Sequence, residues 1–113
     1  MKPRKIKFRA WNDETKKMLL WDDIKRFGNL NKLLSLYHVH VMQFTGLQDK
    51  NEKEIYEGDK LYVCPGYSST VEFQDGMFVS VYKHPEDGET IPLLDAIGKD
   101  TVIVGNIYEN QSQ

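Results

Sequence analysis

The sequence predicts a mainly β protein of the α+β class, built as a small curled antiparallel sheet or a partly open barrel. Two observations lead to this prediction. Several short runs alternate apolar with polar residues, which is the period of a strand that buries one face. Turn-forming dipeptides separate these runs at short spacing, as in small antiparallel barrels and sandwiches.

Residues 5–21 predict a hairpin. In residues 5–10 apolar side chains alternate with basic ones, so the first strand should have one apolar and one basic face. Asn12-Asp13 predicts a turn, and residues 17–21 predict the strand that returns from it.

Two short helical segments are predicted next. Asp22 or Asp23 is a candidate cap for a helical turn that stops at Gly28. Asn29 or Asn31 is a candidate cap for a second, amphipathic helix. Four apolar residues at helical spacing predict that second helix, namely Leu30, Leu33, Leu34 and Tyr37.

The stretch from Val41 to Val63 is the part around which the other segments are organised. It contains two strand-like runs joined by an acidic turn. We expect the first run to stop at Thr45-Gly46 and the second to begin after Gly58-Asp59. The acidic turn between them is predicted to be solvated and to discourage pairing with another strand.

The C-terminal part is predicted to contain only β structure and one irregular segment. Asp75-Gly76 suits the two positive-φ positions of a type I′ hairpin, and residues 101–108 predict the closing strand. Residues 84–90 indicate a polar loop. Three apolar residues then return to the core as an irregular strand or one helical turn, namely Leu93, Leu94 and Ile97. The order is SH3-like in pattern only, and such an analogy gives no function.

Length and composition favour one domain spanning residues 1–113, large enough to form a core without metals or disulfides. The single cysteine, Cys64, excludes an internal disulfide framework. Because the sequence shows no apolar run typical of a signal peptide or a membrane span, we expect a soluble cytoplasmic protein without membrane association.

Charge is distributed unevenly along the chain. Residues 1–32 hold ten Lys or Arg against four Asp or Glu, a net charge of +6. The remainder holds five lysines against thirteen acids, a net charge of −8. This separation indicates a nucleic-acid surface at the N-terminus, or two parts that attract each other within or between subunits, or simply a solvated strand face, which is the simplest interpretation.

Several segments resemble the YopX family of phage and prophage proteins, and they span nearly the whole chain. They are F-R-A-W at 8–11, K-K-M at 16–18, M-Q-F-T-G-L-Q-D-K-N at 42–51, K-E-I-Y-E-G-D at 53–59 and V-G-N-I-Y-E-N at 104–110. The resemblance implies an α+β part near residues 1–44 and an all-β part near residues 45–113, in a small phage-encoded protein of the bacterial cytoplasm that self-associates. It implies no reaction.

One position departs from the family pattern. Glu52 stands where the family's turn has glycine, so we expect Asn51 to supply any left-handed residue, because Asn tolerates that conformation better than Glu.

Metal binding is the first chemical hypothesis. His38 and His40 lie two apart on a predicted strand, so both imidazoles share a face, but a site also needs a third ligand such as His84, Cys64 or a carboxylate. No local spacing supplies one, so we predict no metal. The acidic turn fails as an EF-hand because Lys53, Glu54 and Lys60 occupy positions that require an oxygen ligand, glycine and a bidentate acid.

Catalysis is the least favoured class of function. Cys64 with His84 is a conceivable nucleophile and base, but Cys64 follows an apolar strand and is expected to be a buried, inert thiol. The sequence has no phosphate-binding glycine loop and no G-x-S-x-G motif. We therefore predict no catalytic residues, no cofactor and no enzymatic activity.

We predict a phage or prophage accessory protein that acts by binding, as a homo-oligomer and with a possible host or phage protein partner. Paired strands with one apolar side leave edges that a second copy can cover. The alternative is nucleic-acid binding through Lys5, Lys7 and Arg9 on one strand face, next to Trp11. Against it, Phe8 and Trp11 are expected to be core residues.

Overall fold

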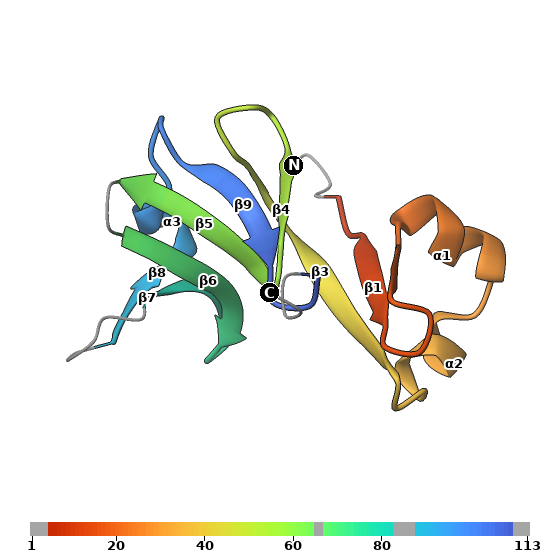
Figure 1. Cartoon of the computed structure of the whole chain (residues 1–113). Coiled ribbons are helices and arrows are strands. Elements are labelled where there is room, and N and C mark those ends of the chain that lie inside the picture. The colour runs from red at the N-terminus through yellow and green to blue at the C-terminus, as the bar shows by residue number, and fades with distance from the viewer. Residues whose placement is uncertain (1–4, 65–66, 83–87, 110–113) are drawn as a thin grey trace. The chain divides into compact units, whose positions relative to one another are not determined.

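The computed structural model describes residues 5–64, 67–82 and 88–109, and the chain divides into two compact units, Met1–Phe44 and Thr45–Gln113 (Figure 1). The first unit holds β1 (Phe8–Asn12), β2 (Lys17–Leu19), α1 (Trp21–Phe27), α2 (Leu30–Leu34) and the first part of β3 (Val39–Gln48). The second holds the rest of β3, β4 (Glu54–Tyr56), β5 (Asp59–Cys64), β6 (Tyr67–Gln74), β7 (Met77–Tyr82), β8 (Glu89–Pro92), α3 (Leu93–Ala96) and β9 (Val102–Asn106). The predicted mainly β fold of the α+β class is confirmed.

The first unit is an antiparallel sheet in the order β2-β1-β3, with α1 and α2 beside it. The N-terminal hairpin is confirmed, with Trp11 opposite Met18 on β2 and opposite His40 on β3. The returning strand is shorter than predicted, because Trp21 already belongs to α1. The Leu20 amide donates to the Asp23 carboxylate over 3.1 Å, so Asp23 acts in the first turn of α1 and is not its cap.

Asn29, not Asn31, caps α2. Its side chain accepts a hydrogen bond from the Lys32 amide at 3.0 Å, which satisfies a donor that the helix itself cannot. Leu33 is buried, but Leu34 and Tyr37 are 55% and 89% exposed, contrary to the predicted apolar face. The helix ends at Leu34, and its five residues can turn only one narrow side toward the core.

The core of the first unit consists of four buried residues on one side of its sheet and on its helices, namely Ala10, Ile24, Leu33 and Val39. Phe8 packs against this cluster, and its ring lies 5.8 Å from that of Trp21. Trp11, Met42 and Phe44 are also buried. The expectation that Phe8 and Trp11 face the protein interior is therefore confirmed for both.

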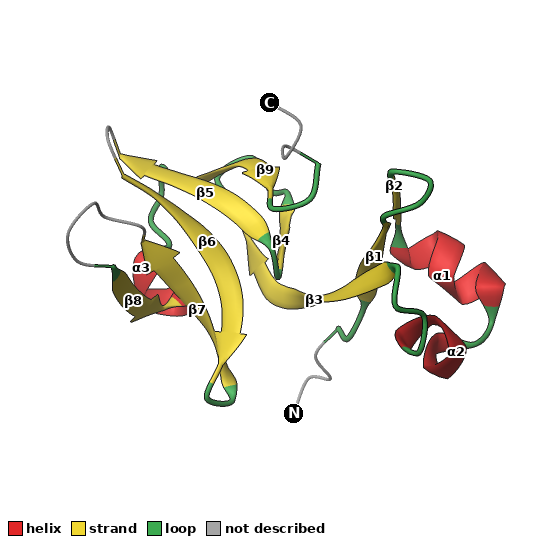
Figure 2. Ribbon diagram, turned by 60° about the horizontal axis from the view of Figure 1, so that its bottom comes forward, coloured by secondary structure: helices red, strands yellow, loops and turns green. Residues whose placement is uncertain are grey.

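The second unit contains a five-stranded antiparallel sheet in the order β8-β7-β6-β5-β9, and β5, β6 and β7 bend together into a curl (Figure 2). Its core is formed by four residues, namely Ile55, Leu61, Val71 and Leu93. Leu93 lies on α3, the single helical turn that was one of two predicted forms, whereas its neighbour Leu94 is 72% exposed.

The predicted β6–β7 hairpin is confirmed. Asp75 and Gly76 have φ values of 52° and 81°, and Gln74 pairs with Met77 across the turn. These are the two positive-φ positions of a two-residue type I′ turn. The loop predicted at residues 84–90 is shorter on its C-terminal side, because Glu89 begins β8, while residues 84–87 lie outside the described residues.

The central stretch differs from prediction in two respects. β3 does not stop at Thr45-Gly46 but continues to Gln48, with Gly46 at a φ of 88° inside the strand. Glycine accepts the positive φ of Gly46 without the steric clash of a Cβ atom, so β3 can continue through this position. The acidic turn contains a further short strand, β4.

Among the described residues, no helix has the length and apolar character needed to cross a bilayer.

Candidate functional site

The acidic turn is exposed at residues 50–53, as predicted, but two of its carboxylates are buried. Asp49 and Asp59 are only 6% and 1% exposed, which corrects the expectation for these two residues. The Oδ1 atom of Asp49 accepts hydrogen bonds from the amides of Asn51 and Lys53 at 2.8 and 3.0 Å. Its Oδ2 atom accepts one from the Ile103 amide at 3.0 Å. Asp59 accepts one from the Tyr56 amide at 2.8 Å.

These contacts determine the ionisation of Asp49. Burial alone would raise its pKa, because a charged carboxylate loses solvation there. Hydrogen bonds from the amides of Ile103, Lys53 and Asn51 outweigh burial, and the pKa of Asp49 falls below its ordinary value. The carboxylate is therefore held as an anion by backbone donors, so it acts as a structural acceptor.

Glu52, and not Asn51, adopts the left-handed conformation in this turn, with a φ of 63°. The reason is the loop geometry. The Asp49 amide donates to the Lys53 carbonyl at 2.9 Å, and the Glu52 amide donates to the Asp49 carbonyl at 3.0 Å. This is a three-residue hairpin loop, in which the left-handed residue takes the last place regardless of side chain.

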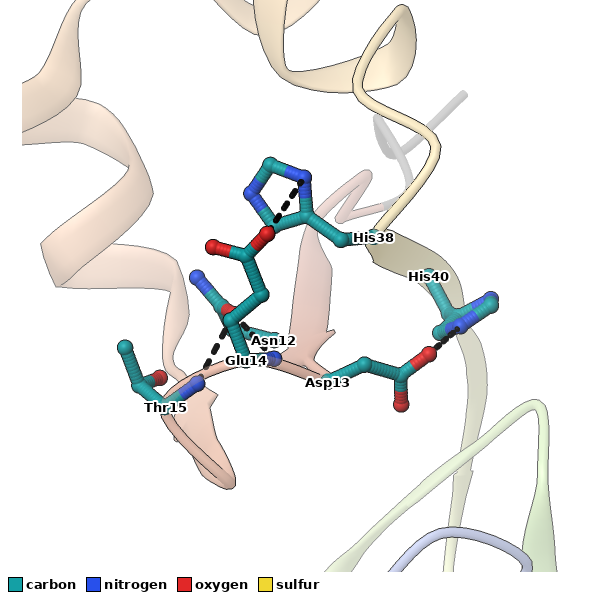
Figure 3. Close-up of polar contacts among 6 residues, drawn as sticks. All are labelled: Asn12, Asp13, Glu14, Thr15, His38 and His40. Carbon is teal, nitrogen blue, oxygen red and sulfur yellow. Dashed lines mark hydrogen bonds and ion pairs between the residues drawn. The ribbon is translucent and has the colours of Figure 1, made fainter.

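The two histidines lie near the turn that joins β1 to β2, and each faces a different carboxylate (Figure 3). The Nε2 atom of His40 lies 2.6 Å from Oδ2 of Asp13. The Nδ1 atom of His38 lies 4.0 Å from Oε1 of Glu14. The Asp13 amide also donates to the His38 carbonyl at 2.8 Å. The turn is thus attached to the start of β3 by both backbone and side chains.

The turn itself is shaped by Asn12, whose Oδ1 atom accepts hydrogen bonds from the amides of Glu14 and Thr15 at 2.9 and 3.1 Å. Such local side-chain to backbone bonds are typical of Asn in turns. His40 contributes most to lowering the pKa of Asp13 below its ordinary value, through their hydrogen bond. Asp13 is therefore an anion at neutral pH.

A metal site does not assemble around these histidines in the described part of the chain, which holds no group of three or more His, Cys, Asp or Glu placed for a metal ion. Two of the third ligands suggested by the sequence, His84 and the side chain of Cys64, lie outside the described residues. The same holds for the hypothetical pairing of Cys64 with His84.

The basic residues Lys5, Lys7 and Arg9 do not all lie on one strand. β1 begins at Phe8, so only Arg9 belongs to it. Lys5 is exposed, while Lys7 and Arg9 are half-buried. The Lys7 amine lies 5.0 Å from the centre of the Phe44 ring. Trp11, the aromatic considered for base stacking, is 7% exposed.

Sequence reasoning missed Asp13 and Glu14 as partners of the histidines. The contact between Asp13 and His40 spans 27 positions, and only the pairing of β1 with β3 brings the two together. The Asn12-Asp13 turn signal placed Asp13 at the end of a hairpin but gave no indication of which strand would lie beside it.

Comparisons with known proteins address the whole chain. The YopX protein family matches residues 7–112. The crystal structure of protein EF1440 from Enterococcus faecalis is similar, with a TM-score of 0.63 and 24% identity over 96% of each chain, a likeness that shows the fold alone. No curated protein matches significantly. Since the family match covers nearly all of the described residues, the chain belongs to the YopX family.

Proposed function

We propose that this chain is a non-catalytic interaction module of a phage or prophage, working in the bacterial cytoplasm and assembling with further copies of itself. Separation of charge between the two units is the observation that carries this proposal. Met1–Phe44 contains ten Lys or Arg and four acids, while Thr45–Gln113 contains five lysines and thirteen acids. Units with net charges of +6 and −8 attract each other between copies.

Exposed apolar side chains add to this support, because each unit carries several that a neighbouring chain can bury. In the first unit they are Ile6, Leu20, Leu34 and Tyr37, and in the second Tyr62, Phe73, Met77, Leu94 and Val104.

Light scattering on the purified full chain at low and high salt tests self-association. We expect a mass that is a multiple of 13.2 kDa and that falls in about 0.5 M salt, where screening confines electrostatic attraction to a few ångströms. Reversing exposed Lys17 to Glu should weaken the assembly, while Lys99→Glu, an equal charge change in the acidic unit, should not. A mass of one chain at every concentration and salt would reject self-association.

The second candidate is nucleic-acid binding through Lys5, Lys7 and Arg9. The exposure of Lys5 and the net charge of the first unit favour it, while burial of Trp11 removes the stacking partner. Binding of duplex and single-stranded probes at low salt should fall steeply as salt rises, and should be abolished by changing all three residues to Glu. Changing Lys25, Arg26 and Lys32 to Glu instead is the matched control. No binding at low salt would exclude this candidate.

A further inference from the structure

Two imidazole–carboxylate contacts join the β1–β2 turn to the start of β3. His40 and Asp13 are 36% and 45% exposed in their side chains and lie 2.6 Å apart. His38 and Glu14 are 21% and 63% exposed and lie 4.0 Å apart. Figure 3 shows both carboxylates leaving one turn and both imidazoles leaving one stretch of chain. The strength of both contacts therefore depends on whether the imidazoles carry a proton.

The contact of His38 has more to gain from a proton on the imidazole than that of His40. Its Nδ1 atom is buried and has no hydrogen-bond partner among the described residues. A buried polar atom left unpaired costs free energy. A proton on this ring adds a positive charge facing Glu14, whose exposed side chain can rotate to close the 4.0 Å gap. Protonation thus converts an unsatisfied group into an ion pair.

Other groups also interact with the residues of these two pairs. Trp11 pairs with His40 across the strands and also hydrogen-bonds Asp13, while Lys16 attracts the Asp13 carboxylate. The Tyr37 ring meets His38 edge-on at 5.4 Å. Lys16 is exposed, so water screens its attraction for Asp13 more than it screens the direct contact from His40.

We propose that His38 and His40 form a proton-sensitive clamp, in which protonated imidazoles hold the β1–β2 turn against the start of β3 and neutral imidazoles loosen it. Histidine is the side chain that ordinarily changes charge between pH 5 and 8. A protonated imidazole faces a carboxylate in the folded unit and water in the unfolded chain, so we expect the two contacts to add more to stability at low pH than at high pH.

Urea unfolding followed by tryptophan emission tests the clamp, since both tryptophans, Trp11 and Trp21, lie in the first unit. The full chain is compared with His38→Gln/His40→Gln at pH 8.0 and 5.5, at a concentration where light scattering gives one mass. The folding equilibrium constant of the natural chain should rise about two- to fivefold relative to the variant on acidification, as expected of partly exposed ion pairs. His84→Gln, which removes the third histidine of the chain, should behave as the natural chain does.

A second variant tests the same two contacts without changing the histidines, in case the histidine variant does not fold. Asp13→Asn/Glu14→Gln keeps both histidines but removes their anions, so it should lose the same pH dependence. If the doubly substituted histidine variant does not fold, single His40→Gln and Asp13→Asn decide the question. The proposal would be overturned if the stability of the natural chain, of the histidine variant and of the carboxylate variant depended on pH in the same way. It would also be overturned if the natural chain lost stability relative to these two variants at pH 5.5.

Discussion

The Oδ2 atom of Asp49 accepts a hydrogen bond from the amide of Ile103 at 3.0 Å, although the two residues are 54 positions apart. The bond joins the β3–β4 loop to β9, which is one end of the five-stranded sheet. Beside it the Lys50 amide donates to the Thr101 carbonyl at 2.9 Å. The loop therefore occupies part of the edge of β9, a place where an unprotected strand would expose backbone donors and acceptors to another chain.

Replacing Asp49 with Ala should destabilise the protein by about 3 kcal/mol, because three backbone donors lose the buried carboxylate that accepts from them. Asp49→Asn should cost less, since an amide oxygen still accepts at one position. Urea unfolding monitored by circular dichroism measures both. Asp100→Asn, an exposed change in the same unit, is the control and should have almost no effect. Equal stability of Asp49→Ala and the natural chain would show that the loop is held by other contacts.

The lowered pKa of Asp49 predicts how stability depends on acid. Since the folded pKa lies below that of the unfolded chain, the contribution of Asp49 is fully present above the unfolded value of about 3.9. It is lost as pH falls through the folded pKa. The stability difference between the natural chain and Asp49→Asn should therefore be constant from pH 7 to 5 and shrink below about pH 4. A difference that grows on acidification would contradict this assignment.

Local signals predicted local structure well. Gly28 ends α1 with a φ of 78°, as its position after the predicted helical turn indicated. Asp75-Gly76 formed the predicted turn because a type I′ turn needs two positive-φ residues, and few other pairs supply them. In both places the deciding interactions lie within a few residues of chain, so the sequence window contains the whole cause.

Features that depend on distant partners were missed. Burial of Asp49 depends on Ile103, and the environment of His40 depends on Asp13 from another strand, so neither follows from nearby residues. The prediction for Glu52 failed differently. Side-chain preference favoured Asn51, but the length of the hairpin loop decides which residue becomes left-handed, and loop length requires knowing where β4 begins.

The cap of α2 gives a prediction confined to the first unit. Asn29→Ala should destabilise that unit by about 1 kcal/mol, since the Lys32 amide loses its side-chain acceptor. Asn31→Ala is the matched control: the same change lies two residues on, inside the helix, where Ala is the better helix former. Tryptophan emission during urea unfolding reports both. The assignment of the cap is wrong if Asn31→Ala proves the more damaging change.

Glu52 offers a stabilising substitution. The left-handed conformation raises the free energy of an L-residue with a side chain by about 1 kcal/mol or more, whereas glycine adopts it at almost no cost. Glu52→Gly should therefore raise the free energy of unfolding by about 0.5–1 kcal/mol, after allowance for the extra freedom of glycine in the unfolded chain. Lys50→Gly is the matched control in the same loop, because Lys50 is not among the positive-φ residues and should lose stability on the same change. Paired urea titrations measure the two effects. If Glu52→Gly is as destabilising as Lys50→Gly, then the left-handed conformation of Glu52 costs nothing that glycine can recover, and side-chain contacts of Glu52 must outweigh the backbone.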